Sequence, residues 1–161
     1  MDLILWRHAE AEDGADDLAR ALTPKGHRQA DRMAQWIKDQ LGPFSGAVRI
    51  LSSPAVRTRQ TADALGMPYE LAPSIAPGAD ADDLLAASMA ASGGPDGHNL
   101  VILVGHNPAI SVLAARLAGA QAPDVSLRRG AAWWYAGNIH SDGAARLTLK
   151  SVMTPSLLAA A

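Results

Sequence analysis

The chain has 161 residues, of which 48% are apolar and 19% charged, and its formal net charge is −2. These values predict one globular domain with a substantial core, and the near-neutral charge argues against a nucleic-acid or membrane surface. The sequence contains no cysteine, which excludes disulfides, thiolate zinc sites and a cysteine nucleophile. Because the first residues do not match a signal peptide and no long apolar run occurs, we expect a cytoplasmic protein without a membrane span.

The beginning of the chain alternates between a strand pattern and a helix pattern. The apolar residues 3–6 predict a strand buried in a parallel sheet, and a polar loop follows over residues 9–22. Thr23 and Pro24 are an N-cap and a first-turn proline. Apolar residues at three- and four-residue spacing then predict a helix that ends at Gly42.

The same alternation continues in the middle of the chain. Residues 48–51 predict a second strand, and Ser53 and Pro54 begin the next helix, with Ser53 as its N-cap. We expect this helix to run to about Leu65 and a short strand to follow at residues 69–71.

A loop rich in proline, alanine and aspartate is expected over residues 72–83, and a helix over residues 82–91. Residues 100–104 are the strongest strand pattern in the chain. The segment Gly-His-Asn-Pro follows that strand, and we expect it to lead into a helix that ends at about Ala118.

Two final strands are predicted at residues 131–136 and 145–152, joined by a turn around residues 141–143. The alternation predicts an α/β fold, a three-layer α/β/α domain with a mixed, mostly parallel central sheet and an antiparallel edge. We expect a single domain over residues 1–154 and a frayed, alanine-rich tail over residues 155–161.

Charged side chains follow three of the predicted strands. Arg7 and His8 come directly after the first strand, Arg57 comes shortly after the second, and His106 follows the strongest one. Ligands of open α/β sheets bind beyond the carboxyl ends of the strands. The predicted elements therefore bring these four side chains to one edge of the sheet.

Two arginines and two histidines at one edge suit phosphoryl transfer. A phosphoryl group in transfer carries negative charge on its equatorial oxygens, and arginines such as Arg7 and Arg57 offer bidentate, permanently cationic donors. A neutral His8 can attack phosphorus in line and form a phosphohistidine, which water then hydrolyses. His106, when protonated, can donate to the phosphoryl oxygens.

We expect neither a metal nor another cofactor. A metal site built on His8 and His106 is disfavoured because the two arginines would repel a cation, and no carboxylate cluster at ligand spacing accompanies the histidines.

The motifs resemble those of the histidine phosphatase superfamily, also called the phosphoglycerate-mutase-like fold. They are Arg7-His8-Ala9, the segments 22–26 and 52–62, and Gly-His-Asn-Pro at residues 105–108. The short length and the segments at 22–26 and 105–108 most resemble SixA-type phosphohistidine phosphatases. The resemblance implies that His8 is the nucleophile and that Arg7, Arg57 and His106 complete the phosphate pocket. Ala9 departs from the family pattern, which has glycine there.

Three further residues are candidates for substrate binding. Arg20 can reach the phosphate or lie on the surface, and its position in the sequence does not decide between the two. Asn107 suits a role in shaping its turn better than a contact with substrate. Ser53 suits the N-cap better than a ligand, although one hydroxyl can serve both roles.

The general acid of the mutase-like branches has no obvious counterpart, and Glu10, Glu12, Asp80 and Asp82 are only candidates. An alkoxide leaving group needs a strong proton donor, whereas the imidazole that leaves from phosphohistidine is much less basic. The short chain also leaves no room for a large capping insertion. Both points favour a phosphohistidine substrate carried by a protein.

The sequence therefore predicts a metal-independent phosphohistidine phosphatase that acts on a phosphohistidine protein or a small phosphorylated substrate and releases inorganic phosphate. The alternatives are a small-molecule phosphomonoesterase with the same nucleophile and a non-catalytic module that binds phosphate or phosphoproteins. We expect a monomer or a weak dimer. Trp133 and Trp134 should point to opposite faces of the sheet, one in the core and one exposed, and the exposed tryptophan would line an edge groove for a partner.

Overall fold

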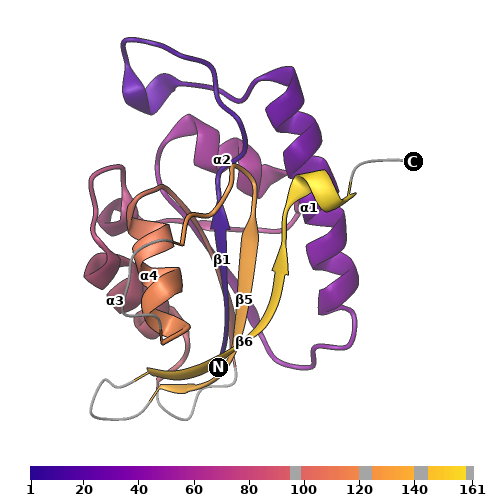
Figure 1. Ribbon diagram of the computed structural model, residues 1–161, viewed down its shortest axis with the longest axis vertical. Helices are drawn as coiled ribbons and strands as arrows, with labels where there is room; N and C mark the ends of the chain where they lie inside the picture. The colour runs from indigo at the N-terminus through magenta and orange to yellow at the C-terminus, as the bar shows by residue number, and fades with distance from the viewer. Residues whose placement is uncertain (95–98, 120–124, 140–144, 159–161) are drawn as a thin grey trace.

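The computed structural model describes residues 1–94, 99–119, 125–139 and 145–158 (Figure 1). Six strands form one sheet: β1 (Asp2–Arg7), β2 (Val48–Ser52), β3 (Glu70–Leu71), β4 (Leu100–Gly105), β5 (Ala132–Ile139) and β6 (Ala145–Met153). Four α-helices accompany it: α1 (Pro24–Leu41), α2 (Val56–Asp63), α3 (Ala81–Ala91) and α4 (Ala109–Leu117). None of the helices in these ranges is long and apolar enough to cross a membrane.

The strand order is β3-β2-β4-β1-β5-β6. The three pairs among β3, β2, β4 and β1 are parallel, whereas β5 pairs antiparallel with both β1 and β6. This confirms the predicted mixed, mostly parallel sheet with an antiparallel hairpin at its edge. The predicted turn at residues 141–143 lies outside the described residues.

Helices cover both faces of the sheet, with α1 and α2 on one face and α3 and α4 on the other (Figure 1). Successive side chains of a strand point to opposite faces, so Leu5 packs with the α3 and α4 layer while Ile4 and Trp6 pack with the α1 and α2 layer. All three side chains are fully buried. A strand covered on both faces needs an apolar residue at every position, which explains the unbroken apolar run.

The start of α2 differs from the prediction. The helix begins at Val56 with Ala55 as its N-cap, and no side chain caps it. The Thr58 hydroxyl lies 2.9 Å from the Ser53 carbonyl oxygen and 2.8 Å from the Ala55 carbonyl oxygen, so it donates within the bend before the helix. Ser53 is therefore not the N-cap. In contrast, Thr23 caps α1 as predicted, because its hydroxyl accepts from the backbone N–H of Gly26 at 2.9 Å.

The tail also differs from the prediction over its first residues. Residues 155–158 were expected to be frayed but form a short 3-10 helix, η3 (Pro155–Leu158), in which Pro155 is buried. Gly130 makes the close packing possible, since a Cβ at that position would lie 2.9 Å from Cγ of Pro155. Residues 159–161 lie outside the described residues.

The two adjacent tryptophans point to opposite faces of the sheet, as predicted. Trp134 is the buried one and lies in the α1 and α2 layer, whereas the partly buried Trp133 packs at the edge of the other core. The Trp134 indole N–H donates to an Asp2 carboxylate oxygen at 2.9 Å, and the Lys150 ammonium lies 4.4 Å from the ring centroid. Because β6 covers the outer edge of β5, Trp134 offers no groove for a partner.

Candidate active site

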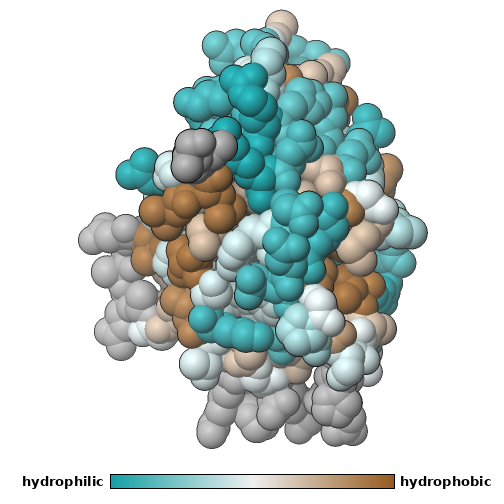
Figure 2. Space-filling view, turned by 90° about the vertical axis from the view of Figure 1, so that its right-hand side faces the viewer, coloured by the Kyte–Doolittle hydropathy of each residue, from teal (hydrophilic) through white to brown (hydrophobic). Residues whose placement is uncertain are grey.

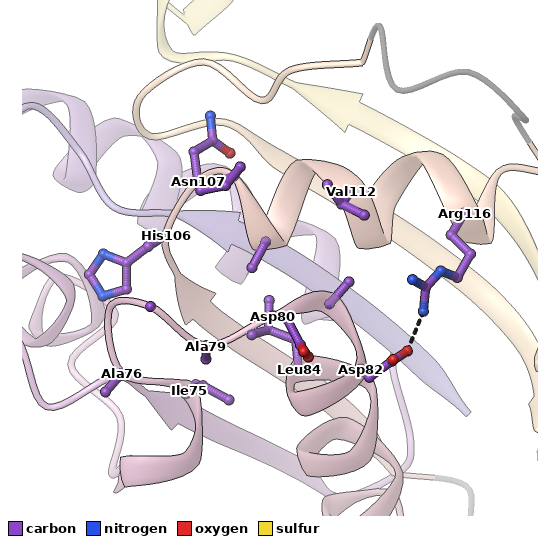
Figure 3. A pocket seen from close by; sticks show the side chains of 14 residues that line it. Ile75, Ala76, Ala79, Asp80, Asp82, Leu84, His106, Asn107, Val112 and Arg116 are labelled. Carbon is purple, nitrogen blue, oxygen red and sulfur yellow. Dashed lines mark hydrogen bonds and ion pairs between the residues drawn. The ribbon is translucent and has the colours of Figure 1, made fainter.

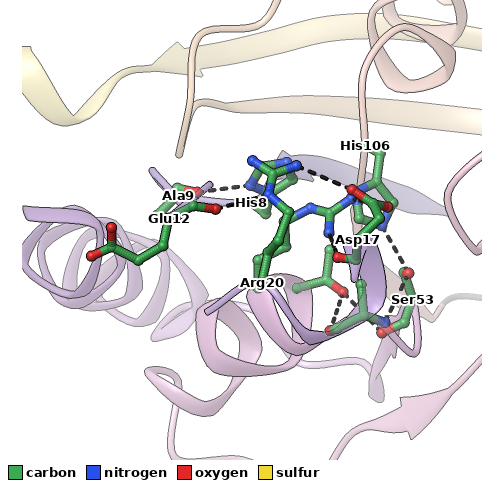
Figure 4. A network of polar contacts seen from close by, with 10 residues as sticks. His8, Ala9, Glu12, Asp17, Arg20, Ser53 and His106 are labelled. Carbon is green, nitrogen blue, oxygen red and sulfur yellow. Dashed lines mark hydrogen bonds and ion pairs between the residues drawn. The ribbon is translucent and has the colours of Figure 1, made fainter. Parts of the chain in front are cut away.

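A cavity of about 360 Å³ lies at the carboxyl ends of β1 and β4. All four side chains that the sequence placed at this edge, Arg7, His8, Arg57 and His106, line the cavity. Figure 4 shows the polar contacts around it. The cavity is therefore rich in cationic groups and carries the two histidines whose ring centroids lie 5.3 Å apart.

The backbone and the ring of His8 are both held by main-chain groups. The His8 backbone N–H donates to the Gly105 carbonyl oxygen at 3.1 Å, which ties the end of β1 to β4. Ring atom Nδ1 lies 2.7 Å from the Ala9 carbonyl oxygen. A carbonyl oxygen only accepts, so Nδ1 carries the proton and Nε2 keeps its lone pair. Burial, together with Arg57 and Arg7, lowers the pKa of His8 to about 4.

The loop after His8 is anchored to two helices. The Ala9 N–H donates to the Thr61 hydroxyl of α2 at 3.1 Å. At the start of α1, the Thr23 N–H donates to the Glu10 carbonyl oxygen at 3.0 Å. The same carbonyl lies so close to Gly26 that a Cβ there would come within 2.0 Å of its oxygen. These contacts explain why the threonine and glycine of the segment 22–26 belong to the site although neither lines the cavity.

Arg57 is held by a residue that the sequence did not single out. Its guanidinium is nearly buried, with an exposed side-chain fraction of 5%. Nη1 donates to the Asp17 carbonyl oxygen at 2.6 Å and Nη2 to an Asp17 carboxylate oxygen at 3.1 Å. Hydrogen bonds from Arg20 and Arg57 lower the pKa of Asp17, so this carboxylate stays ionised and keeps the arginine oriented.

Arg20 belongs to the cavity lining, which its place in the sequence left open. Its Nε donates to the Glu12 carbonyl oxygen at 2.8 Å, and its Nη1 lies 3.1 Å from the other Asp17 carboxylate oxygen. Asp17 therefore links two arginines within the polar loop between β1 and α1. That loop contains the short 3-10 helix η1 (Asp17–Ala19).

Arg7 is fixed from the side of β5. Its Nη1 donates to the Leu127 carbonyl oxygen at 2.8 Å, while its buried Nε has no hydrogen-bond partner among the described residues. Burial and the neighbouring Arg129 lower the pKa of Arg7. Because β5 runs antiparallel to β1, its amino end lies at the same edge as the carboxyl ends of the parallel strands. This is why Leu127 and Arg129 reach the site.

His106 is fixed by Ser53. Its Nε2 lies 2.8 Å from the Ser53 hydroxyl oxygen, and that oxygen also accepts from the Ala55 N–H at 3.3 Å. The buried Nδ1 of His106 has no partner in the described part of the chain. Burial, with His8 and Arg57 adding to it, lowers the pKa of His106 to about 3. Ser53 itself is fully buried and lies outside the cavity lining, so it contacts the histidine instead of the cavity.

Asn107 lines the cavity, but its side chain is used to hold neighbouring segments. Its amide N–H₂ donates to the Leu127 carbonyl oxygen at 3.2 Å, and its amide oxygen accepts from the Ser111 hydroxyl. These contacts join the turn after β4 to α4 and to the segment before β5.

The four carboxylates proposed as general acids do not line the cavity that holds His8 and His106, which is called the phosphate cavity below after its expected ligand. The carboxylate of Glu10 accepts from the Thr23 hydroxyl at 2.8 Å, and that of Asp80 caps α3. Asp82 pairs with Arg116 at 2.6 Å, and Glu12 contributes its backbone carbonyl to the network. The carboxylates that do line the cavity are Asp13 and Asp17. No motif in the sequence marked either of them.

A second cavity of about 450 Å³ opens beside His106 (Figure 3). It shares Gly78, His106 and Asn107 with the phosphate cavity. Apolar side chains such as Leu84 and Val112 line much of it, and the Arg116–Asp82 pair lies at its far side (Figure 3). The two cavities are therefore neighbours that meet at the turn after β4.

The comparisons with known proteins agree with this geometry. The family model described as histidine phosphatase superfamily (branch 1) matches residues 3–79. Phosphohistidine phosphatase SixA of Escherichia coli strain K12 is 31% identical over 130 residues, which cover 76% of this chain and 78% of that protein. A SixA homolog of Haemophilus influenzae is 38% identical over 74 residues, covering 44% of this chain and 45% of that protein.

Among solved structures, the protein histidine phosphatase SixA complexed with tungstate superposes with a TM-score of 0.78 and 27% identity, over 98% of this chain and 99% of that chain. The fold that carries the two histidines and the arginines is therefore shared with that structure along nearly the whole chain. The chain belongs to the histidine phosphatase superfamily, within which it is a phosphatase of the SixA type.

Proposed function

We propose that this protein hydrolyses phosphohistidine carried by a protein, through a covalent phosphohistidine intermediate on His8. The observation that carries the proposal is the state of His8, which lines a cavity together with several arginines. Its Nδ1 is occupied by the Ala9 carbonyl, and its Nε2 has no hydrogen-bond partner among the described residues. A pKa of about 4 keeps the ring neutral at neutral pH, so its lone pair is available for attack on phosphorus.

In the first step, Nε2 of His8 forms a bond to phosphorus while the bond from phosphorus to the substrate nitrogen breaks. The other ring nitrogen of the substrate imidazole takes up a proton from solvent before the transfer, so the imidazole leaves as a neutral ring that keeps this proton. In the second step, water attacks phosphorus, loses a proton to solvent and displaces His8, which releases inorganic phosphate. Arg7, Arg20 and Arg57 face the charge that develops on the equatorial oxygens.

His106 serves as a neutral donor in this proposal, in place of the protonated donor expected from the sequence. The Ser53 oxygen accepts from the Ala55 N–H, which leaves the Ser53 hydroxyl proton to donate to Nε2 of His106. The ring proton is then on Nδ1, the buried atom without a partner. This atom donates to a phosphoryl oxygen and needs no net charge on the ring.

The carboxylates around the cavity support phosphohistidine over an alkyl ester as the substrate. The pKa of Asp17 is lowered by its arginine partners, so Asp17 is ionised at neutral pH and has no proton to donate, and Glu10, Asp80 and Asp82 are engaged in other contacts. Asp13 is the other carboxylate in the cavity lining. An imidazole leaving group needs little assistance from an acid, whereas an alkoxide needs a strong one. The named relative in Escherichia coli is a phosphohistidine phosphatase.

The test is phosphate release from a histidine-phosphorylated carrier protein and from an alkyl phosphate, measured side by side with EDTA present. We expect release from phosphohistidine that EDTA does not slow, and a loss of at least about 10³-fold in kcat for His8→Ala. Circular dichroism of the variant controls for folding. Near-normal turnover by His8→Ala would exclude the mechanism, and preference for the alkyl ester would assign the protein to the small-molecule phosphomonoesterases, with Asp13 the first acid to test.

A further inference from the structure

A cationic groove adjoins the phosphate cavity on the side of α1. It encloses about 450 Å³ and shares Arg7 and Arg129 with the phosphate cavity. Figure 2 shows this side of the molecule, where hydrophilic side chains gather in a band over the upper and central surface. The cations of the groove are Arg7, Lys25, Arg28, Arg32, Arg128 and Arg129, and Glu10 is the one carboxylate that lines it.

The positive charge of this groove contrasts with the negative net charge of the whole chain. The protein has 14 lysine and arginine residues and a formal net charge of −2, yet six of those cations line one groove beside a single carboxylate. Cations lining one concave surface reinforce one another and raise the local concentration of an anionic partner. The groove therefore has a field of opposite sign to the protein's net charge.

The cations of α1 do not serve the fold. Lys25, Arg28 and Arg32 follow one another at three- and four-residue spacing, so they form a stripe about 10 Å long on one face of the helix. The buried face of α1 is made by other residues, among them Met33 and Ile37. Like charges at these spacings destabilise a helix, so the stripe needs an explanation outside the stability of α1.

Three of the six cations of the groove are available to a partner. Arg129 lies 3.4 Å from a Glu10 carboxylate oxygen, but Lys25, Arg28 and Arg128 are exposed and have no ion pair with any residue that the structure describes. A single exposed cation binds an anion weakly, but several exposed cations together attract a polyanionic surface, and this attraction depends on salt.

We infer that this groove binds acidic side chains of the phosphohistidine protein, in the chain segment next to the phosphorylated histidine. The inference rests on the proposed function, because its partner is the substrate of that function. The groove adjoins the site of phosphoryl transfer, with which it shares Arg7 and Arg129. When the phosphoryl group of a protein substrate lies at His8, the substrate residues next to its phosphohistidine reach the stripe on α1. The exposed cations suit a transient protein contact better than a small polyphosphate, which binds best where its charge is desolvated by buried donors.

The experiment uses two peptides phosphorylated on one histidine, identical except that one has glutamates on both sides of it and the other has glutamines. We expect kcat/KM for the glutamate peptide to exceed that for the glutamine peptide by about tenfold at low salt, and the ratio to approach one as salt is added. The double variant Arg28→Glu, Arg32→Glu should bring the ratio to one or below. The matched control is Lys38→Glu, an exposed cation of the last turn of α1 about 20 Å from Lys25, which should leave the ratio unchanged.

Free phosphohistidine separates this inference from the proposed function. If free phosphohistidine is hydrolysed and the two peptides have equal kcat/KM, the inference is wrong and the function stands. If neither free phosphohistidine nor either peptide is hydrolysed, both fail. Tripolyphosphate is the last probe. The inference is overturned if the two peptides have equal kcat/KM while tripolyphosphate competes tightly with the glutamine peptide in the wild type but not in Arg28→Glu, Arg32→Glu. In that case the groove binds small polyanions.

Discussion

Asp17 and Arg57 are joined through two atoms of the aspartate, its carbonyl oxygen and a carboxylate oxygen, at 2.6 and 3.1 Å from the guanidinium. The two contacts fix a planar donor group that otherwise has several rotatable bonds. Arg57 is therefore oriented before a phosphoryl group binds, and it lines the cavity in this orientation. Preorganised donors of this kind stabilise charge without a reorganisation cost at the moment of reaction.

Arg57→Ala should lower kcat/KM for phosphohistidine by roughly 10²-fold, about 3 kcal/mol, because it removes a preorganised cationic donor. Arg59→Ala is the matched control, since Arg59 lies two positions along the same helix and does not line the cavity. Steady-state kinetics of both variants measure the effect. A loss below about tenfold for Arg57→Ala, or an equal loss for Arg59→Ala, would argue against the role of Arg57.

Ser53→Ala should disturb the tautomer of His106. Without the hydroxyl that donates to Nε2, the ring proton is no longer directed to Nδ1, and we expect kcat to fall by about tenfold. Nitrogen NMR of labelled histidine reads the tautomer directly: Nδ1 of His106 should be protonated in the wild type, and the variant should show a mixture.

Ser52→Ala is the control for this experiment, because the neighbouring Ser52 hydroxyl is equally buried but donates to the Ser53 carbonyl oxygen and does not contact His106. If Ser53→Ala retains the wild-type tautomer together with its kcat, then Ser53 does not position His106.

The sheet and the convergence of its charged residues were predictable, because they follow from periodicity and from the rule that parallel strands end at one edge. The apolar runs of β1 and β4 mark buried strands, and Arg7, His8 and His106 come directly after them. Asp17 was not predictable, since it is one of several acidic residues in a polar loop and its importance depends on where that loop folds back. Arg129 could be found only once β5 was known to be antiparallel.

The misplaced start of α2 has a similar cause. Ser53 and Pro54 have the local pattern of an N-cap and a first-turn proline. In the fold, however, the Ser53 hydroxyl lies beside Nε2 of His106, a residue 53 positions away in the chain, and its oxygen accepts from the Ala55 N–H, which precedes the helix. A contact between segments so distant in sequence overrides the local preference, and no pattern within ten residues of Ser53 carries that information.

The burial of His8 should make the stability of the protein depend on pH. The folded pKa of about 4 lies below the ordinary value of 6.5, so between these values the unfolded chain binds a proton that the folded chain does not. The contribution of His8 to the free energy of unfolding is therefore fully present above about pH 6.5. It falls by about 2 to 3 kcal/mol as the pH drops toward 4. Urea unfolding at pH 7 and at about pH 4.5 measures the difference.

His8→Asn should reduce this difference, whereas the exposed His27→Asn should leave it as in the wild type. The comparison of the two variants removes the contribution of carboxylates that titrate over the same range. An identical pH dependence in His8→Asn and the wild type would show that His8 titrates at its ordinary pKa in the folded protein.

Gly26→Ala tests whether the loop after His8 depends on close contact with α1. A Cβ at residue 26 would lie 2.0 Å from the Glu10 carbonyl oxygen, a backbone atom that cannot move without displacing the segment next to His8. We expect a loss of about 3 kcal/mol in the free energy of unfolding and a fall in kcat, because relief of the clash shifts the nucleophile. Gly42→Ala is the control: at residue 42 a Cβ meets nothing nearer than 3.4 Å and the backbone is right-handed helical, so its stability should stay within about 0.5 kcal/mol of the wild type. If Gly26→Ala is as stable and as active as Gly42→Ala, the loop adapts freely and the contact with α1 does not position His8.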